Sequence, residues 1–79
     1  MSVKEAFAAT LRRSRLAAGL SQERLARASG LDRTTLSLLE RGKQQPTLST
    51  ILLVAEHLGV SAAHLVQEVE DFLRSRERS

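Results

Sequence analysis

The chain has 79 residues and no cysteine, and 42% of its residues are hydrophobic. A chain this short forms one domain at most, here residues 1–79, and without disulfides its stability must come from helix packing or oligomerisation. The apolar runs are too short to span a bilayer and residues 1–5 lack the apolar region of a signal peptide, so neither membrane insertion nor export is expected.

Basic residues are concentrated in the first half of the chain. The formal net charge is +3, but residues 1–43 hold nine of the twelve basic and four of the nine acidic residues, which leaves the remainder acidic. A basic half suits a polyanionic partner. An ordinary solvated surface rich in arginine would give the same composition, so composition alone does not decide between the two.

Three of the four glycines occur in one pattern, in which an apolar residue and then Ser or Asp follow the glycine, at Gly19, Gly30 and Gly59. Glycine favours the left-handed conformation that ends a helix, and Ser or Asp caps the next one. Helical periodicity is present and strand alternation is absent, so we expect an all-α fold of five helices. Periodicity and caps place these helices over about residues 3–18, 21–29, 32–41, 47–58 and 62–75.

The apolar faces of the first and fourth helices predict much of the core. Phe7, Leu11 and Ala18 share one face of the first helix. The fourth helix follows the loop 43–46, which has no apolar anchor and contains the only proline. Its apolar residues recur at helical intervals. They are Leu48, Ile51, Leu52, Ala55 and Leu58.

The third helix is amphipathic in a way that suits base recognition. At about 100° per residue, Leu36, Leu39 and Glu40 share its inner side. Its outer side has groups that hydrogen-bond base edges or meet a thymine methyl group. These outer residues are Arg33, Thr34, Ser37, Leu38 and Arg41. Any solvated helix can carry such residues, so this signal is weak by itself.

The residues on either side of this helix are candidates for phosphate contacts. Ser21 and Gln22 begin the second helix, whose free amides and positive dipole end suit a DNA phosphate, and Lys43 and Gln44 lie in the following loop. Contacts on both flanks would hold the third helix in register. The plainer alternatives are a helix cap for Ser21 and a solvated surface for Gln22 and Lys43.

Two opposite charges fall on apolar helix faces. Glu40 lies on the inner face of the third helix, and Arg15 lies with Phe7 and Leu11 on the first. Each charge is best explained by the other, so we expect a buried or half-buried ion pair that joins the two helices.

From about Leu11 to Leu65, the chain resembles the Cro and phage-repressor type of helix-turn-helix domain. The resemblance rests on segments 19–23, 25–26, 30–31, 39–43, 46–47 and 58–61 in combination, and the third helix is similar to that of restriction-modification controller proteins. It implies a repressor-like bundle with helices two and three as the helix-turn-helix. It also implies a cytoplasmic, nucleoid-associated protein encoded by a bacterium or phage.

The resemblance assigns roles residue by residue. It implies base contacts by Arg33, Thr34, Ser37 and Leu38. It implies contacts to phosphates or groove edges by Gln22, Arg41 and Lys43, and it implies the same pairing of Arg15 with Glu40. Leu38 stands where several phage repressors have a polar base-reading residue, so direct readout relies more on Arg33 and Thr34. Thr35 replaces an aromatic residue common among controller-like variants.

The fifth helix carries an apolar stripe longer than a four-helix core requires. Its far half, Val69, Phe72 and Leu73, is a candidate homodimer interface, as expected for a protein that reads palindromic half-sites. Alternatively, the helix folds back and buries these residues within the chain.

The leading hypothesis is a sequence-specific regulator that binds double-stranded DNA, most simply a repressor. Two alternatives stay open: an antitoxin that binds both an operator and a toxin, and a helical interaction module without DNA binding. An enzyme is not expected, because His57 and His64 have no clustered partners. No sequence feature indicates a metal, a cofactor or a small-molecule ligand.

Overall fold

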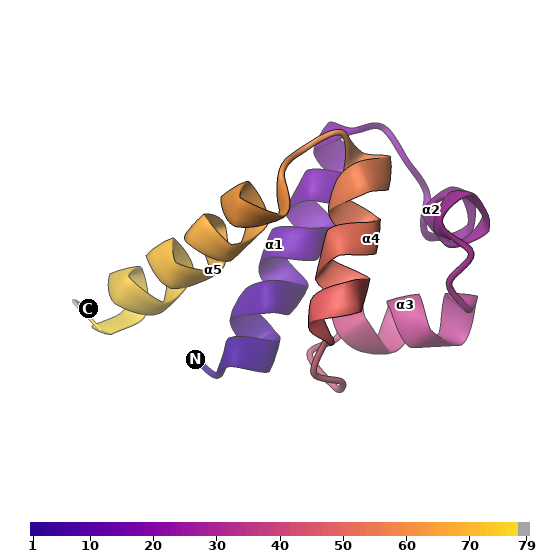
Figure 1. Cartoon of the computed structure of the whole chain (residues 1–79). Coiled ribbons are helices and arrows are strands. Elements are labelled where there is room, and N and C mark those ends of the chain that lie inside the picture. The colour runs from indigo at the N-terminus through magenta and orange to yellow at the C-terminus, as the bar shows by residue number, and fades with distance from the viewer. Residues whose placement is uncertain (78–79) are drawn as a thin grey trace.

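The computed structural model describes residues 1–77, and this part of the chain forms five α-helices without strands (Figure 1). The all-α fold is therefore confirmed. Helices α2 and α3 lie together at one side of the molecule, and α5 extends from the other side. The helices are α1 (Val3–Ala17), α2 (Gln22–Ser29), α3 (Arg33–Glu40), α4 (Leu48–Leu58) and α5 (Ala62–Glu77).

The helix ends follow the predicted caps. Thr47 and Ser21 cap α4 and α2 through their hydroxyls. Gly30 and Gly59 adopt left-handed φ values of 76° and 74°, which side chains with a Cβ rarely adopt. After Gly59, the Val60 N–H donates to the Ala55 carbonyl at 3.1 Å and closes the end of α4. The glycine pattern therefore marks real helix ends.

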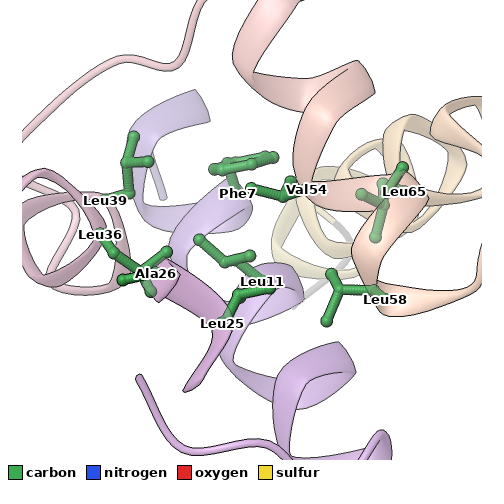
Figure 2. Close-up of a cluster of buried hydrophobic side chains, with 10 residues drawn as sticks. Phe7, Leu11, Leu25, Ala26, Leu36, Leu39, Val54, Leu58 and Leu65 are labelled. Carbon is green, nitrogen blue, oxygen red and sulfur yellow. The ribbon is translucent and has the colours of Figure 1, made fainter. Parts of the chain in front are cut away.

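One hydrophobic core joins all five helices (Figure 2). Leu11, Leu25, Leu36 and Leu39 are fully buried between α1, α2 and α3, and Leu65 of α5 is fully buried as well. The core thus packs α3 against α1, and it packs α2 against α3 and α4. Its members are Phe7, Leu11, Leu25, Ala26, Leu36, Leu39, Val54, Ala55, Leu58 and Leu65.

Three predicted core positions are wrong. Ala18 is the C-cap of α1, which ends at Ala17, and its side chain is exposed because the chain has already turned away there. Leu48 and Leu52 are also exposed, since the packed side of α4 is centred on Val54 and Leu58. Ala55 and Leu58 of the predicted stripe are buried as expected, so the packed side of α4 overlaps this stripe but is turned from it toward Val54.

Helix α5 packs mainly against α1. Leu65 closes the core, while Val69, Phe72 and Leu73 are half-buried. The Arg13 guanidinium lies 4.8 Å from the centre of the Phe72 ring. The sequence predicts an end near residue 75 and a frayed tail from Arg74 to Ser79, but the helix continues to Glu77, so fraying before that residue is wrong. Residues 78–79 lie outside the described part of the chain.

Within residues 1–77, no single helix has the length and hydropathy to cross a bilayer, although α4 and α5 would qualify by length and composition if joined across their 108° bend. The same residues contain no group of three or more His, Cys, Asp or Glu side chains placed to hold a metal ion.

Candidate nucleic-acid interface

Helices α2 and α3 are joined by a three-residue turn that starts at Gly30 (Figure 1). The Ser29 hydroxyl is buried and donates to the Leu25 carbonyl at 2.7 Å, while accepting from the Leu31 N–H at 3.4 Å. Asp32 then caps α3, its Oδ1 accepting from the Thr34 N–H. Local hydrogen bonds thus tie the end of α2 to the start of α3.

A buried ion pair anchors α3 to α1. Arg15 Nε donates to Glu40 Oε2 at 2.6 Å and Arg15 Nη2 donates to Glu40 Oε1 at 3.0 Å, so the contact is bidentate. The side chains are only 10% and 2% exposed. Arg15 Nη1 also donates to the Leu20 carbonyl at 2.7 Å. The expected ion pair is therefore present, and it holds the C-terminal end of α3 against α1.

Gln22 joins the same cluster, which the sequence did not indicate. Its Nε2 donates to Glu40 Oε1 at 3.1 Å, and the side chain is half-buried. The first residue of α2 is thereby linked to the last residue of α3. Periodicity within a single helix could not find this contact, because it depends on how α2 and α3 cross.

The outer side of α3 is accessible. Arg33 and Thr34 are exposed on its first turn, and Ser37 and Leu38 are half-exposed further along. Arg33 has no hydrogen bond or ion pair within residues 1–77 that would hold its guanidinium. The four predicted base-contacting residues therefore lie along one helix, with an arginine at its start.

The predicted backbone-contacting residues lie at both flanks of α3. Ser21 is exposed at the start of α2, where its Oγ accepts from the Arg24 N–H at 3.1 Å, so the cap is real. Arg41 and Lys43 are exposed after α3, and Gln44 is half-buried beside them. The Lys43 N–H donates to the Leu38 carbonyl at 2.9 Å, which fixes the start of this loop relative to α3.

A second polar cluster, also missed from the sequence, joins α1 to α5. Glu68 receives the Arg13 guanidinium at one carboxylate oxygen, and His64 Nε2 lies 2.7 Å from the other. Arg13 is still largely exposed. Through this cluster Arg13, an outward-facing residue of α1, helps to hold α5 in place.

Two short helices joined by a tight turn, with the polar side of the second one exposed, form a helix-turn-helix, the unit that places a recognition helix in the DNA major groove. The family model described as helix-turn-helix matches residues 11–65. The chain therefore belongs to the helix-turn-helix family of transcriptional regulators.

Known relatives and solved structures agree with this membership. Over 66 residues, the chain is 41% identical to the control protein C.SmaI of Serratia marcescens, covering 84% of this chain and 79% of that protein. The clp gene regulator ClgR of Corynebacterium glutamicum superposes with a TM-score of 0.92 at 29% identity, covering 99% of this chain and 83% of that one.

The likeness to restriction-modification controllers extends to solved structures. The controller protein C.AhdI of Aeromonas hydrophila is 42% identical, with a TM-score of 0.75, over 78% of this chain and 94% of that one. The resemblance to the Cro-like class and to controller proteins is therefore confirmed.

Proposed function

We propose that residues 1–79 form one DNA-binding domain that acts as a homodimeric transcriptional repressor on a palindromic operator. The observation that carries the proposal is the accessible side of α3, which presents an arginine, two hydroxyls and an aliphatic group from a helix fixed on its inner side. A rigidly held helix with free polar side chains can be matched to base edges without first being ordered.

Each side chain has a role in this proposal. Arg33 would donate to the O6 and N7 atoms of a guanine, Thr34 and Ser37 would bond base edges, and Leu38 would contact a thymine methyl group. The backbone contacts would come from Ser21, Gln22, Arg41, Lys43 and Gln44. Gln22 has one Nε2 hydrogen engaged with Glu40, which leaves the other for a phosphate.

The first experiment selects binding duplexes from a random library and then measures their affinity at several salt concentrations. We expect a palindromic motif whose half-sites are about one DNA turn apart, and an affinity that falls steeply with salt through counterion release. Failure to enrich any motif would contradict sequence-specific binding. An enriched motif without twofold symmetry would contradict the palindromic operator.

Variants then test the assignment of individual residues. Arg33→Ala should reduce discrimination at one base pair by about 1 to 3 kcal/mol, whereas Lys43→Ala should weaken binding to all duplexes and lower the salt slope by about one. Arg27→Ala is the matched control, because this exposed arginine pairs with Glu23 on α2. Equal losses on selected and random DNA for Arg33→Ala would contradict base readout by this residue.

Repression is tested separately from binding. A reporter transcribed from a promoter that contains the selected operator should lose expression when the protein is present and regain it with Arg33→Ala. An increase in expression with the parent protein would instead identify an activator.

A further inference from the structure

The first turn of α1 lies against the loop that follows α3. A Cβ atom built on Gly42 would lie 3.5 Å from Glu5 Cα and 3.7 Å from the Glu5 backbone nitrogen, so the loop backbone packs directly on this turn. Gly42 precedes Lys43, which the proposed function assigns to a DNA phosphate. The start of α1, this loop and α3 lie along one side of the molecule (Figure 1). The start of α1 therefore adjoins the proposed DNA-binding surface.

Lys4 lies on the side of α1 that packs against α3. At about 100° per residue, it shares this side with Ala8, Leu11 and Arg15, which follow it along the helix. Ala8 and Leu11 are buried, and Arg15 pairs with Glu40 at the end of α3. Lys4 is exposed although it shares this side, so it lies beyond the part of α1 that α3 covers.

Hydrogen bonds fix the backbone that carries Lys4. Ser2 Oγ accepts from the Glu5 N–H at 3.1 Å, and the Ser2 N–H donates to Glu5 Oε1 at 2.8 Å, so the two residues form a capping box. Glu5 is the acidic residue of this turn, and this bond holds its carboxylate at the helix start. Lys4 is thus presented from an ordered turn, whose backbone loses little further entropy when the side chain binds a partner.

A lysine at this position does not stabilise α1. The start of a helix carries the positive end of the helix dipole, so acidic side chains are favoured there and basic ones are not. Glu5 follows this rule and Lys4 departs from it. Within residues 1–77, Lys4 has no ion pair that would compensate. Departures from local rules are expected at functional sites.

We propose that Lys4 is a further DNA contact, whose ammonium group binds a backbone phosphate beside the one assigned to Lys43. The inference rests on the proposed function, because it extends the flank of α3 formed by Arg41, Lys43 and Gln44. Two lysines on segments that pack against each other can contact neighbouring phosphates. Such contacts add affinity and fix the register of α3, but they read no sequence. The first helix thereby becomes part of the DNA-binding surface.

The test measures binding to a selected and a random duplex from about 50 mM to about 500 mM salt, with Lys4→Gln compared with Arg12→Gln. Arg12 is the matched control, because it is exposed on the same helix about 12 Å farther along and its loss changes the net charge equally. Lys4→Gln should weaken binding to both duplexes by about 3- to 10-fold near 0.1 M salt and lower the salt slope by about one. Arg12→Gln should bind as the parent does.

Two further measurements separate a DNA contact from an effect on folding. Lys4→Gln should melt at the parent's temperature or slightly above it, because the substitution removes a cation from the first turn of a helix. Lys4→Arg keeps the charge and should restore the parent's salt slope. Weaker binding by a variant that is at least as stable as the parent would therefore come from the lost contact.

The outcomes distinguish this inference from the proposed function. A parent that binds a selected duplex with an affinity and salt slope unchanged by Lys4→Gln would overturn the inference alone. Equal losses for Lys4→Gln and Arg12→Gln would also overturn it, since net charge would then explain both. A changed ratio of selected to random affinity would contradict a phosphate contact. A parent that binds neither duplex would contradict the proposed function and, with it, this inference.

Discussion

Glu40→Ala is the sharpest test of how the recognition helix is held. Glu40 accepts from Arg15 Nε at 2.6 Å, from Arg15 Nη2 at 3.0 Å and from Gln22 Nε2 at 3.1 Å. Its side chain is 2% exposed, so the alanine variant leaves the Arg15 charge buried with only the Leu20 carbonyl as an acceptor. Removal of one partner from a buried pair costs about 3 to 5 kcal/mol.

That cost is a large part of the stability available to this chain. At about 0.05 to 0.15 kcal/mol per residue, a domain of this size is stable by about 4 to 12 kcal/mol. One kcal/mol shifts the melting temperature of such a domain by about 4 to 8 °C, so Glu40→Ala should melt at least about 12 °C below the parent. Melting followed by circular dichroism at neutral pH measures this shift.

Glu23→Ala is the matched control for this experiment. Glu23 also pairs with an arginine, since its Oε1 lies 2.9 Å from Arg27 Nη2, but both side chains are more than half exposed. Loss of an exposed pair four residues apart on one helix costs about 0.3 to 0.5 kcal/mol, or a few degrees. If Glu40→Ala and Glu23→Ala melt within a few degrees of each other, the Arg15–Glu40 pair is not buried in the folded protein.

A double variant separates the role of the charge from that of the packing. Replacing both partners, Arg15→Met with Glu40→Leu, leaves no buried charge without a partner and should recover much of the lost stability. Recovery of the melting temperature without recovery of DNA affinity would indicate that the pair orients α3 as well as closing the core.

Three further predictions concern the helix ends. Gly59→Ala should lower the free energy of unfolding by about 1 to 2 kcal/mol in urea titrations, because alanine is strained at the left-handed φ of 74°. The new Cβ would meet no atom within 4 Å, so the effect comes from backbone strain alone. An unchanged urea midpoint would contradict this prediction. Ser21→Ala should cost about 1 kcal/mol in the same assay through loss of the α2 cap, and an effect below about 0.3 kcal/mol would be inconsistent with the observed bond to Arg24. Hydrogen bonds from the Ser2 backbone N–H and, to a smaller extent, with the Ser2 hydroxyl hold the pKa of Glu5 below its usual value of 4.5. The stability that ionised Glu5 contributes is therefore present above about pH 4.5 and is lost as the pH falls through the lowered pKa. The difference in melting temperature between the parent and Glu5→Gln should shrink toward pH 3, and a constant difference would disprove this linkage.

Local rules acting along the chain account for what the sequence predicted well. The five helices and the caps at Ser21, Asp32 and Thr47 follow from residues within a few positions of each helix end. The buried pair of Arg15 and Glu40 was also predictable, because each charge contradicts the apolar pattern of its own helix. Two such contradictions of opposite sign identify a contact between helices without any knowledge of how those helices cross.

The sequence by itself therefore determined the helices, their ends and the polar outer side of α3, since these depend on periodicity and on cap chemistry. Only the tertiary structure decided which sides of α4 and α5 are covered. Leu48 and Leu52 fit a core stripe by periodicity but are exposed, and Phe72 fits an outer surface but packs beneath Arg13. The tertiary structure also decided that Gln22 hydrogen-bonds Glu40 in the buried cluster with Arg15, because this contact depends on how α2 crosses α3. Burial depends on the crossing of neighbouring helices, and a pattern along one helix contains no information about that crossing.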